Sequence, residues 1–220
     1  MRVVAYVPLK LTNERVPGKN TRELPDGTPL YHLILRALAR VPSIDDIYVY
    51  CSSKELEPHL PPGAKFLARS TELDLPSTRI NEVMVSFAND VAADVYLLAH
   101  ATAPFLSTES LASLVQKVST GDHDSALTVV RLQEFLWDAG SPLNYDPVSI
   151  PRTQDLKPLY TETTGAYVYT RELVMQGRRV GASPALVEVS KIEAIDINEP
   201  LDWEIASAVY QTRLRQGGSA

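Results

Sequence analysis

Short apolar runs alternate with helical patterns along most of the chain, and this alternation limits the folds open to it. Runs such as 3–7 and 95–99 are apolar at consecutive positions, which predicts strands buried on both faces. Strands are expected at 3–7, 47–50, 65–67, 95–99, 125–130, 165–169 and 185–189. Amphipathic helices are expected at 29–38, 80–91, 107–118 and 201–213, with Ser77 or Thr78 capping the second and Ser107 or Thr108 starting the third. The succession predicts an α/β fold with a mostly parallel central sheet.

The length and apolar content favour one domain. The chain has 220 residues, 45% of them hydrophobic, which is enough to bury a full core. We place this domain at residues 1–215 and expect 216–220 to form a flexible tail. Between 134 and 160 the periodic pattern weakens, and prolines occur together with Phe135, Trp137 and Tyr145. We interpret this stretch as an irregular excursion that covers the site or meets a second subunit.

Charge and cysteine content narrow the classes of function. A formal net charge of -6 argues against a nucleic acid held by a broad basic surface, although a local cationic pocket would still fit a small anion. Cys51 is the one cysteine, so an internal disulfide and a cysteine metal cluster are excluded and a reducing compartment is expected. No apolar stretch approaches the roughly 20 residues of a membrane span. We expect a cytoplasmic protein without a nucleic-acid or membrane partner.

The first expected strand runs into a polar loop that carries the cations Lys10, Arg15 and Lys19. A helical pattern follows, and backbone N–H groups and lysines can converge on phosphate in such a strand–loop–helix arrangement. The loop lacks the Gly-Lys-Ser/Thr ending of a Walker loop and the Gly-x-Gly-x-x-Gly dinucleotide fingerprint. We interpret it as a triphosphate site, and the alternative is a basic loop on the solvated surface.

Polar residues directly follow several expected strands, among them Lys10, Ser52, Arg69 and His100. Ligands of parallel sheets bind at the carboxyl ends of the strands, so these side chains are expected to share one rim. His100 suits proton acceptance or a sugar contact, because its ordinary pKa is near neutrality, and it equally suits a structural hydrogen bond.

A second informative segment, 195–203, precedes the final helix. Asp196 and Asn198 alternate along what is expected to be a strand end, so both would present oxygens on one face. Mg²⁺ suits such a pair, because it binds one or two protein oxygens and takes its other ligands from water and phosphates. The alternative is a loop in which these residues, with Asp202, only cap the final helix.

Together these motifs resemble the sugar cytidylyltransferases that make CMP-sialic acid and CMP-Kdo. Pro8, Lys10 and residues 16–20 (Val-Pro-Gly-Lys-Asn) are similar to the family's N-terminal signature, and 195–203 to its late aspartate segment. Further similar blocks follow in order at 69–73, 96–105, 153–156 and 164–168. The resemblance implies a three-layer Rossmann-like nucleotidyltransferase fold with a small excursion for dimerisation. It also implies a homodimer that uses Mg²⁺ to transfer CMP from CTP to an acidic 2-keto sugar, releasing pyrophosphate.

The resemblance implies roles for individual residues. Catalysis would fall to Lys10, Lys19 and Asp196. The nucleotide would be bound by Lys10, Asn13, Arg15, Lys19, Asn20, Arg69, Ser77 and Thr78. The acidic sugar would meet His100, Thr102, Arg152, Gln154 and Thr164. Mg²⁺ would be held by Asp196, with Asn198 as a ligand directly or through water.

The chain departs from the family pattern in both halves of the expected site. Lys10 stands for an arginine and gives a point charge without a bidentate fork, and Asn198 stands for the second aspartate. In the sugar-facing blocks, His100 replaces Gln, Thr153 replaces Arg and Thr164 replaces Asn. Because lost hydrogen-bond partners discriminate against the original substrate, we expect a divergent member nearer the sialate branch, with an acceptor other than N-acetylneuraminate.

Two alternatives stay open at this point. A related nucleotidyltransferase could use a different nucleotide or acceptor. A catalytically weak homologue could keep the fold and only bind nucleotide sugars. The substitutions at Lys10 and Asn198 favour this alternative.

Overall fold

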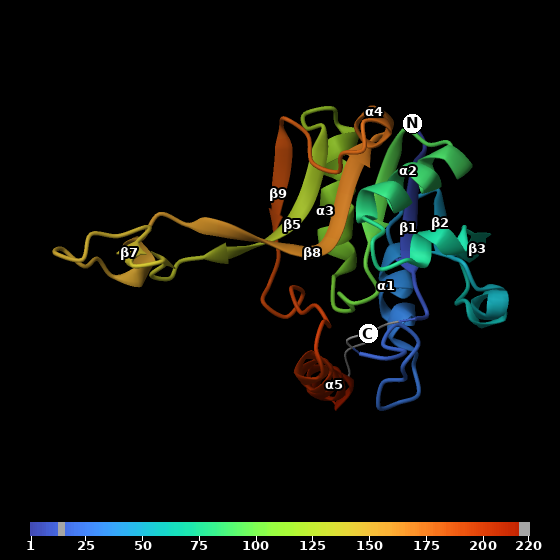
Figure 1. The fold of residues 1–220 in the computed structure, drawn as a ribbon, viewed down its shortest axis with the longest axis horizontal. Helices are drawn as coiled ribbons and strands as arrows, with labels where there is room; N and C mark the ends of the chain where they lie inside the picture. The colour runs from blue at the N-terminus through green and yellow to red at the C-terminus, as the bar shows by residue number, and fades with distance from the viewer. Residues whose placement is uncertain (13–15, 216–220) are drawn as a thin grey trace.

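The computed structural model describes residues 1–12 and 16–215, and the expected tail at 216–220 lies outside this range. A seven-stranded sheet forms its centre, in the order β3-β2-β1-β4-β8-β5-β9 (Figure 1). The strands are β1 (Val3–Leu9), β2 (Asp46–Cys51), β3 (Ala64–Ala68), β4 (Val95–Ala99), β5 (Ser125–Leu132), β8 (Leu159–Thr170) and β9 (Pro184–Glu188). Neighbours pair in parallel, except that β8 runs antiparallel between β4 and β5. The predicted α/β fold with a mostly parallel sheet is confirmed.

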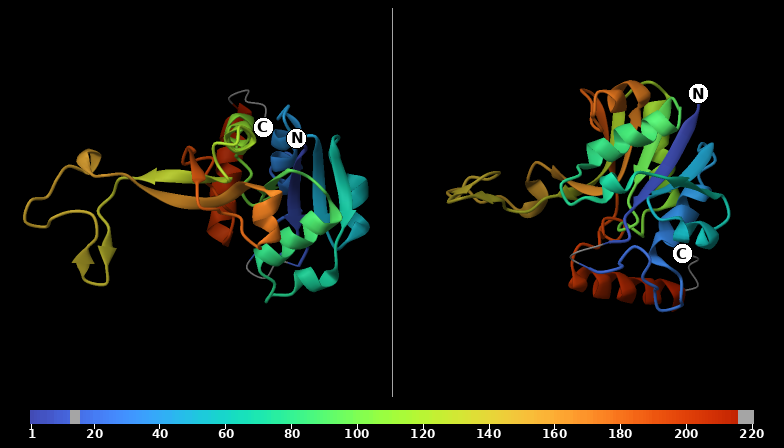
Figure 2. Two further views of the ribbon diagram at one scale, coloured as in Figure 1. Left: turned by 90° about the horizontal axis from the view of Figure 1, so that it is seen from above. Right: turned by 45° about the vertical axis from the view of Figure 1, so that its right-hand side comes forward.

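Helices cover both faces of the sheet, as strands buried on both faces require (Figure 2). One face carries α1 (Leu30–Ala39) and α3 (Thr108–Ser119), and the other carries α2 (Ile80–Asp90) and α4 (Arg171–Met175). Successive residues of β1 alternate between the two cores, so that Ala5 and Val7 enter the first and Val4 and Tyr6 the second. The short 3-10 helices η1 (Lys54–His59) and η2 (Thr71–Asp74) follow β2 and β3. Among the described helices, none is long and apolar enough to cross a membrane.

The observed N-terminal cap agrees with the sequence-based prediction for α3 and differs from it for α2. Ser107 caps α3 as expected, because its Oγ accepts a backbone N–H of the first turn. The predicted cap of α2 at Ser77 or Thr78 is wrong, since this helix begins at Ile80. The N–H of Arg79 donates to the Glu82 carboxylate at 3.1 Å, so a side chain inside the helix closes its own first turn.

A third, smaller core joins α5 (Pro200–Arg215) to the chain that follows β1. Trp203, Ala206 and Tyr210 lie three or four positions apart on one helical face, and they pack with Leu24 and Ile197. The loop after β1 and the late segment 195–198 are therefore held against one another, although they lie at opposite ends of the chain.

Beyond the body of the molecule, β5 and β8 carry residues 133–158, which we call the arm. Figures 1 and 2 show the arm extending well away from the sheet. It contains the two-stranded hairpin β6 (Trp137–Asp138) and β7 (Ser141–Pro142) and the 3-10 turn η3 (Thr153–Asp155). Its exposed large apolar side chains are Phe135, Trp137, Leu143, Val148 and Ile150. The arm coincides with the excursion expected at 134–160.

Candidate active site

The polar residues that follow the parallel strands share one edge of the sheet. β1, β2, β3 and β4 pair in parallel, so their carboxyl ends lie side by side. A cavity of about 340 Å³ opens at this edge, and we call it the rim pocket. Its polar lining residues are Lys10, Lys19, Asn20, Arg69, Thr78, His100 and Thr102. The structure thus brings together residues from both the nucleotide and the sugar side of the expected site.

The loop after β1 is closed by its own polar groups. Gly18 adopts a φ of +65°, which a residue without Cβ reaches at little cost. Asn20 is buried, and its Nδ2 donates to the carbonyl of Lys10 at 2.9 Å. The amide expected to bind nucleotide therefore holds the loop in shape and places Lys10 at the pocket. Asn13 and Arg15 lie outside the described residues.

The late segment meets this loop through a lysine. Lys19 Nζ donates to the backbone carbonyl of Ile197 over 2.5 Å. The N–H of Ile197 donates to the carbonyl of Thr102 at 2.9 Å, and its side chain is fully buried in the third core. The predicted strand end at Asp196 and Asn198 is wrong: this segment is an irregular loop, because β9 ends at Glu188 and the backbone bonds instead to the loop after β4.

The two oxygens of the Asp196 carboxylate have different surroundings. Oδ2 accepts the Thr164 hydroxyl at 3.1 Å and Asn198 Nδ2 at 2.7 Å. Oδ1 is buried and has no hydrogen-bond partner. A buried carboxylate oxygen without a donor is costly unless a ligand compensates it. The helix-capping alternative applies to Asp202, whose Oδ2 accepts the N–H groups of Asn198 and Glu199 at 2.8 Å each.

This donor set is compatible with Mg²⁺. Within residues 1–12 and 16–215, no group of three or more His, Cys, Asp or Glu side chains could hold a metal ion. Mg²⁺ needs only one or two protein oxygens, because substrate phosphates and water supply the rest of its octahedron. Asp196 Oδ1 fits this requirement, while Asn198 Nδ2 donates to the other oxygen of the same carboxylate.

Arg69 reaches the rim pocket from the end of β3. Its side chain is 3% exposed and one terminal nitrogen donates to Asp74 Oδ1 at 2.6 Å. The other oxygen of Asp74 accepts the Ser52 hydroxyl. Arg69 Nε is buried without a hydrogen-bond partner, so the guanidinium has an unused donor. The sequence singled out Arg69 but not Asp74, because the pairing of Asp74 with Arg69 depends on the fold of the turn η2.

Thr78 and Ser77 differ in position. Thr78 lines the pocket and its hydroxyl donates to the carbonyl of Glu72 at 3.0 Å, whereas Ser77 is exposed and lies outside the lining. Leu75 and Pro76 add an apolar wall beside Thr78. This wall suits the face of a nucleobase.

His100 lies at the end of β4 among charged groups of the site. Its backbone N–H donates to the carbonyl of Gly165 at 3.0 Å. Burial lowers the pKa of the imidazole to about 4; the Asp196 carboxylate opposes this shift, while the cations Arg179 and Lys19 reinforce it. His100 is therefore neutral at neutral pH, which suits a hydrogen bond to a ligand better than proton abstraction.

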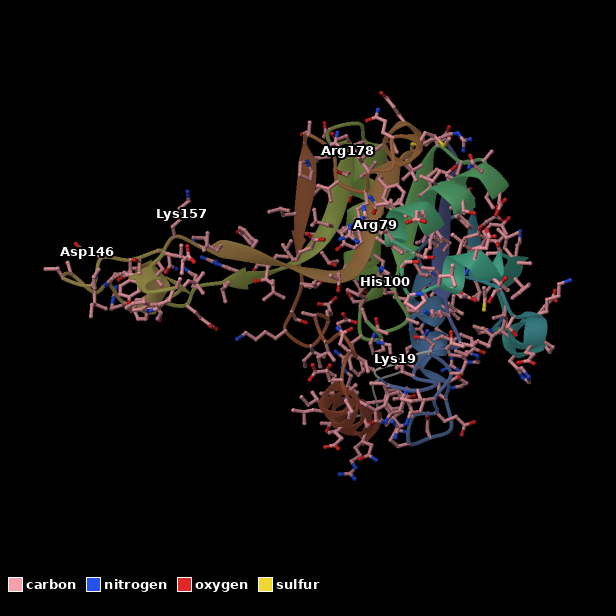
Figure 3. All side chains as sticks on the ribbon, viewed as in Figure 1. Lys19, Arg79, His100, Asp146, Lys157 and Arg178 are labelled. Atoms are coloured by element: carbon pink, nitrogen blue, oxygen red, sulfur yellow. The ribbon has the colours of Figure 1, made fainter. Side chains whose placement is uncertain are left out.

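Three residues expected on the sugar side, Arg152, Gln154 and Thr164, do not line the pocket, and Thr164 contacts Asp196 instead. Arg152 and Gln154 belong to the arm, and both are exposed. Arg152 pairs instead with Asp155, at 2.7 Å and 3.1 Å. Figure 3 labels Asp146 and Lys157 on the arm, well separated from Lys19 and His100. Within one chain, Arg152 and Gln154 do not join the site.

A further charged group near His100 was missed. Arg179 stacks its guanidinium 4.1 Å from the ring centre of Tyr167 and donates to Glu162 at 3.0 Å. Tyr167 also donates to Glu162, so the three side chains form one network. Arg179 follows a short helix and belongs to no motif, so only the antiparallel position of β8 beside β4 reveals its proximity to His100.

The chain is similar to known cytidylyltransferases. The family model described as cytidylyltransferase matches residues 4–213. N-acylneuraminate cytidylyltransferase of Oncorhynchus mykiss is 28% identical over 214 residues, 93% of this chain and 49% of that protein. N-acylneuraminate cytidylyltransferase A of Danio rerio is 27% identical over 201 residues, 87% of this chain and 46% of that protein. The chain thus spans about half the length of these fish relatives.

A bacterial relative matches from end to end, and solved structures share the fold. CMP-N,N'-diacetyllegionaminic acid synthase of Legionella pneumophila is 27% identical over 228 residues, 96% of this chain and 97% of that protein. A CMP:2-keto-3-deoxy-manno-octonic acid synthetase solved with CTP has a TM-score of 0.73 at 15% identity, over 97% of this chain and 100% of that one. A 4-diphosphocytidyl-2C-methyl-D-erythritol synthase from Anaerococcus prevotii has a TM-score of 0.64 at 14% identity, over 96% of both chains.

Proposed function

The chain belongs to the cytidylyltransferase family, and on that premise we propose that it transfers CMP from CTP to the hydroxyl of an acidic 2-keto sugar, releasing pyrophosphate. The observation that carries the proposal is the contact between Lys19 and Ile197, which joins the cationic loop that lines the pocket to the segment of Asp196. The names of the relatives include acylneuraminate and diacetyllegionaminic acid, both acidic sugars. They support an acceptor of this class.

Charge neutralisation and positioning account for the reaction. The sugar oxygen attacks the α-phosphorus as the bond from that phosphorus to the bridging oxygen breaks, and negative charge gathers on the leaving pyrophosphate. Lys10 and Lys19 line the pocket and neutralise that charge. Arg69, whose charge is balanced by Asp74, offers its unpartnered Nε to an acceptor of the nucleotide. The apolar wall of Leu75 and Pro76 covers the base.

Mg²⁺ is the cofactor that we infer for this site. When bound, it neutralises phosphate charge and polarises the α-phosphate. Asp196 would hold it through Oδ1, and Asn198 orients the same carboxylate through its amide. This role makes the neutral amide at position 198 an orienting group rather than a second charged ligand.

The acceptor side is formed by neutral hydrogen-bonding groups. His100 and Thr102 line the same pocket as the lysines, and His100 is uncharged at neutral pH. A neutral imidazole can donate to or accept from a sugar hydroxyl. We infer that the pair orients the sugar, while the proton of the attacking hydroxyl passes to water or to the leaving pyrophosphate rather than to His100.

We also propose a homodimer formed through the arm. The arm exposes Trp137, Val148 and Ile150 away from the body, a set of apolar side chains that solvent does not favour. Arg152 and Gln154, expected to bind the sugar, lie on the arm and outside their own chain's pocket. In a homodimer, the arm could carry them to the pocket of the partner subunit.

Two smaller inferences concern the domain organisation of the chain and the compartment in which it acts. Seven strands, from β1 near the start of the chain to β9 near its end, form one sheet, so we infer that residues 1–215 act as one domain. Cys51 is the one cysteine of the chain and its thiol is buried and free, which fits a reducing, cytoplasmic compartment.

Pyrophosphate release tests the proposal. Purified protein with Mg²⁺ is given CTP, UTP, ATP or GTP, each with a panel of acidic 2-keto sugars and with neutral sugars. We expect release with CTP and at least one acidic sugar. Binding of CTP without release in any combination would instead identify a nucleotide-binding homologue without activity, and release with another nucleotide would reassign the donor.

A further inference from the structure

The strand β8 is interrupted where it passes the candidate site. Its pairing with β5 shifts between Leu127 and Val129, so that residues 163–166 of β8 face the single residue Thr128. Within this bulge Thr164 has a φ of +56°. Bulges of this kind redirect a side chain and are frequent beside active sites.

The conformation of Thr164 is strained. Left-handed φ values are unfavourable for residues with a Cβ, and a β-branched residue is among the least suited to them. Glycine, asparagine and aspartate adopt this region far more readily. Thr164 is exposed, so packing in a core does not explain why a threonine occupies the position.

Neighbouring contacts hold the bulge in this shape. The hydroxyls of Thr128 and Thr163 lie 2.6 Å apart, and Thr163 Oγ1 also donates to the carbonyl of Thr128 at 3.2 Å. Ala166 N donates to Thr128 Oγ1 at 3.3 Å. At Gly165, a Cβ would lie 3.1 Å from Leu106 Cδ1, so this position is packed too tightly to relax easily. The surrounding structure therefore imposes the strain on Thr164.

The imposed conformation gives Asp196 a second donor. Thr164 Oγ1 donates to Asp196 Oδ2 at 3.1 Å, the same oxygen that accepts Asn198 Nδ2 at 2.7 Å. With both donors on Oδ2, Oδ1 is left buried and unpartnered. When hydrogen bonds hold one oxygen of a carboxylate, its other oxygen is also fixed in position. Supporting hydrogen bonds orient metal-binding carboxylates in this way.

We propose that Thr164 is a positioning residue, which orients Asp196 so that Oδ1 is available to the cation that accompanies the nucleotide. The inference rests on the proposed function, since it assigns a cation to that function's site. It also changes the part expected for Thr164, from a contact of the sugar to a support of the carboxylate. The bulge in β8 then holds Thr164 in a strained backbone conformation, and in that conformation its hydroxyl fixes the Asp196 carboxylate.

Three substitutions separate strain from hydrogen bonding. Thr164→Val removes the hydroxyl and keeps the β-branched shape, whereas Thr164→Gly removes both. Because both variants lose the bond to Asp196, the difference between their melting temperatures without ligand reports the strain. We expect Thr164→Gly to melt about 2–4 °C above Thr164→Val. Thr164→Ser retains the hydroxyl and serves as the rescue variant.

Cation binding provides the second readout. Mg²⁺ is titrated into each variant saturated with CTP, and the thermal shift gives its apparent affinity. We expect Thr164→Val and Thr164→Gly to weaken this affinity by about 10-fold or more, and Thr164→Ser to stay near wild type. Ala139→Gly is the matched control: Ala139 has a φ of +47° in the β6–β7 turn, so the change should raise the melting temperature and leave the affinity for Mg²⁺ unaltered.

The outcomes distinguish this inference from the proposed function. If the wild type binds CTP and Mg²⁺ but releases no pyrophosphate with any acceptor, the proposed function fails, while the variants still test Thr164. Equal melting temperatures for the Gly and Val variants would overturn the strain. Wild-type affinity for Mg²⁺ in Thr164→Val, or no stabilisation of the wild-type CTP complex by Mg²⁺, would overturn the positioning role.

Discussion

Lys19 Nζ lies 2.5 Å from the carbonyl oxygen of Ile197, a residue 178 positions later in the chain. The contact joins a loop that ends the first strand to the segment that precedes the last helix. It fixes the Lys19 ammonium next to the segment that carries Asp196 before any ligand binds. Such preorganisation is the main source of electrostatic stabilisation in transfer of a phosphoryl or nucleotidyl group.

Lys19 is therefore expected to affect turnover strongly. Lys19→Met keeps an apolar stem of similar length and removes the charge. We expect the rate of pyrophosphate release at saturating CTP to fall by about 100-fold, because a preorganised donor to the leaving group is lost. Lys54→Met, at an exposed position of η1, is the control and should retain the wild-type rate. Wild-type turnover in Lys19→Met would remove this lysine from the reaction.

Asp74 is expected to contribute to stability through Arg69. Asp74→Ala leaves a guanidinium that is 3% exposed without its carboxylate, so the free energy of unfolding should fall by about 3 kcal/mol. Asp155→Ala breaks the Arg152 pair, whose side chains are 73% and 48% exposed, and should cost at most about 1 kcal/mol. Urea denaturation measures both. Equal losses in the two variants would show that burial of the Arg69 pair has no energetic consequence.

His100 gives a prediction about pH. Its pKa falls from the ordinary 6.5 to about 4 in the folded protein, chiefly because of burial, so the unfolded chain binds the proton first. The contribution of this residue to the free energy of unfolding is complete above pH 6.5 and is lost as the pH falls toward 4. His100→Gln should remove about 2 kcal/mol of that acid destabilisation. The His100 ring signal is identified in the NMR spectrum by its absence from His100→Gln, and titration of that signal near its ordinary pKa would contradict this account.

The arm gives a prediction about assembly. If two copies associate through it, the wild type should sediment as a dimer at micromolar concentration. Trp137→Ser should raise the dimer dissociation constant by about 30-fold, as expected when an interface loses a tryptophan worth about 2 kcal/mol. Met175→Ser alters an exposed apolar residue on α4 and should leave the dimer intact. A wild type that sediments as a monomer would refute the proposed dimer.

Much of the fold and part of the site could be predicted because their signals are local in sequence. Apolar runs and helical periodicity locate the strands and helices, and parallel strands place the residues that follow them on one rim. Lys10, Arg69 and His100 meet in the rim pocket for this reason. The predicted membership of the cytidylyltransferase family, drawn from motifs spread along the chain, is confirmed by the family match over residues 4–213.

The features that were missed depend on tertiary context. The helical start at Ile80 is decided by the Glu82 side chain rather than by the serine and threonine before it. Asp196 lies in a loop because its segment bonds to the chain after β4 and not to a neighbouring strand. The left-handed Thr164 follows from a register shift opposite Thr128, which no propensity of threonine indicates.

The most direct test follows a radiolabelled α-phosphate of CTP. In the presence of Mg²⁺ and acidic 2-keto sugars, the label should move from CTP to a CMP-sugar. Asp196→Asn preserves the size of the side chain and removes its charge, so transfer should fall by about 100-fold or more, while CTP continues to protect the protein against thermal unfolding. Wild-type transfer by Asp196→Asn, or no labelled sugar product from the wild type with any acidic acceptor, would contradict the proposed metal-assisted cytidylyl transfer.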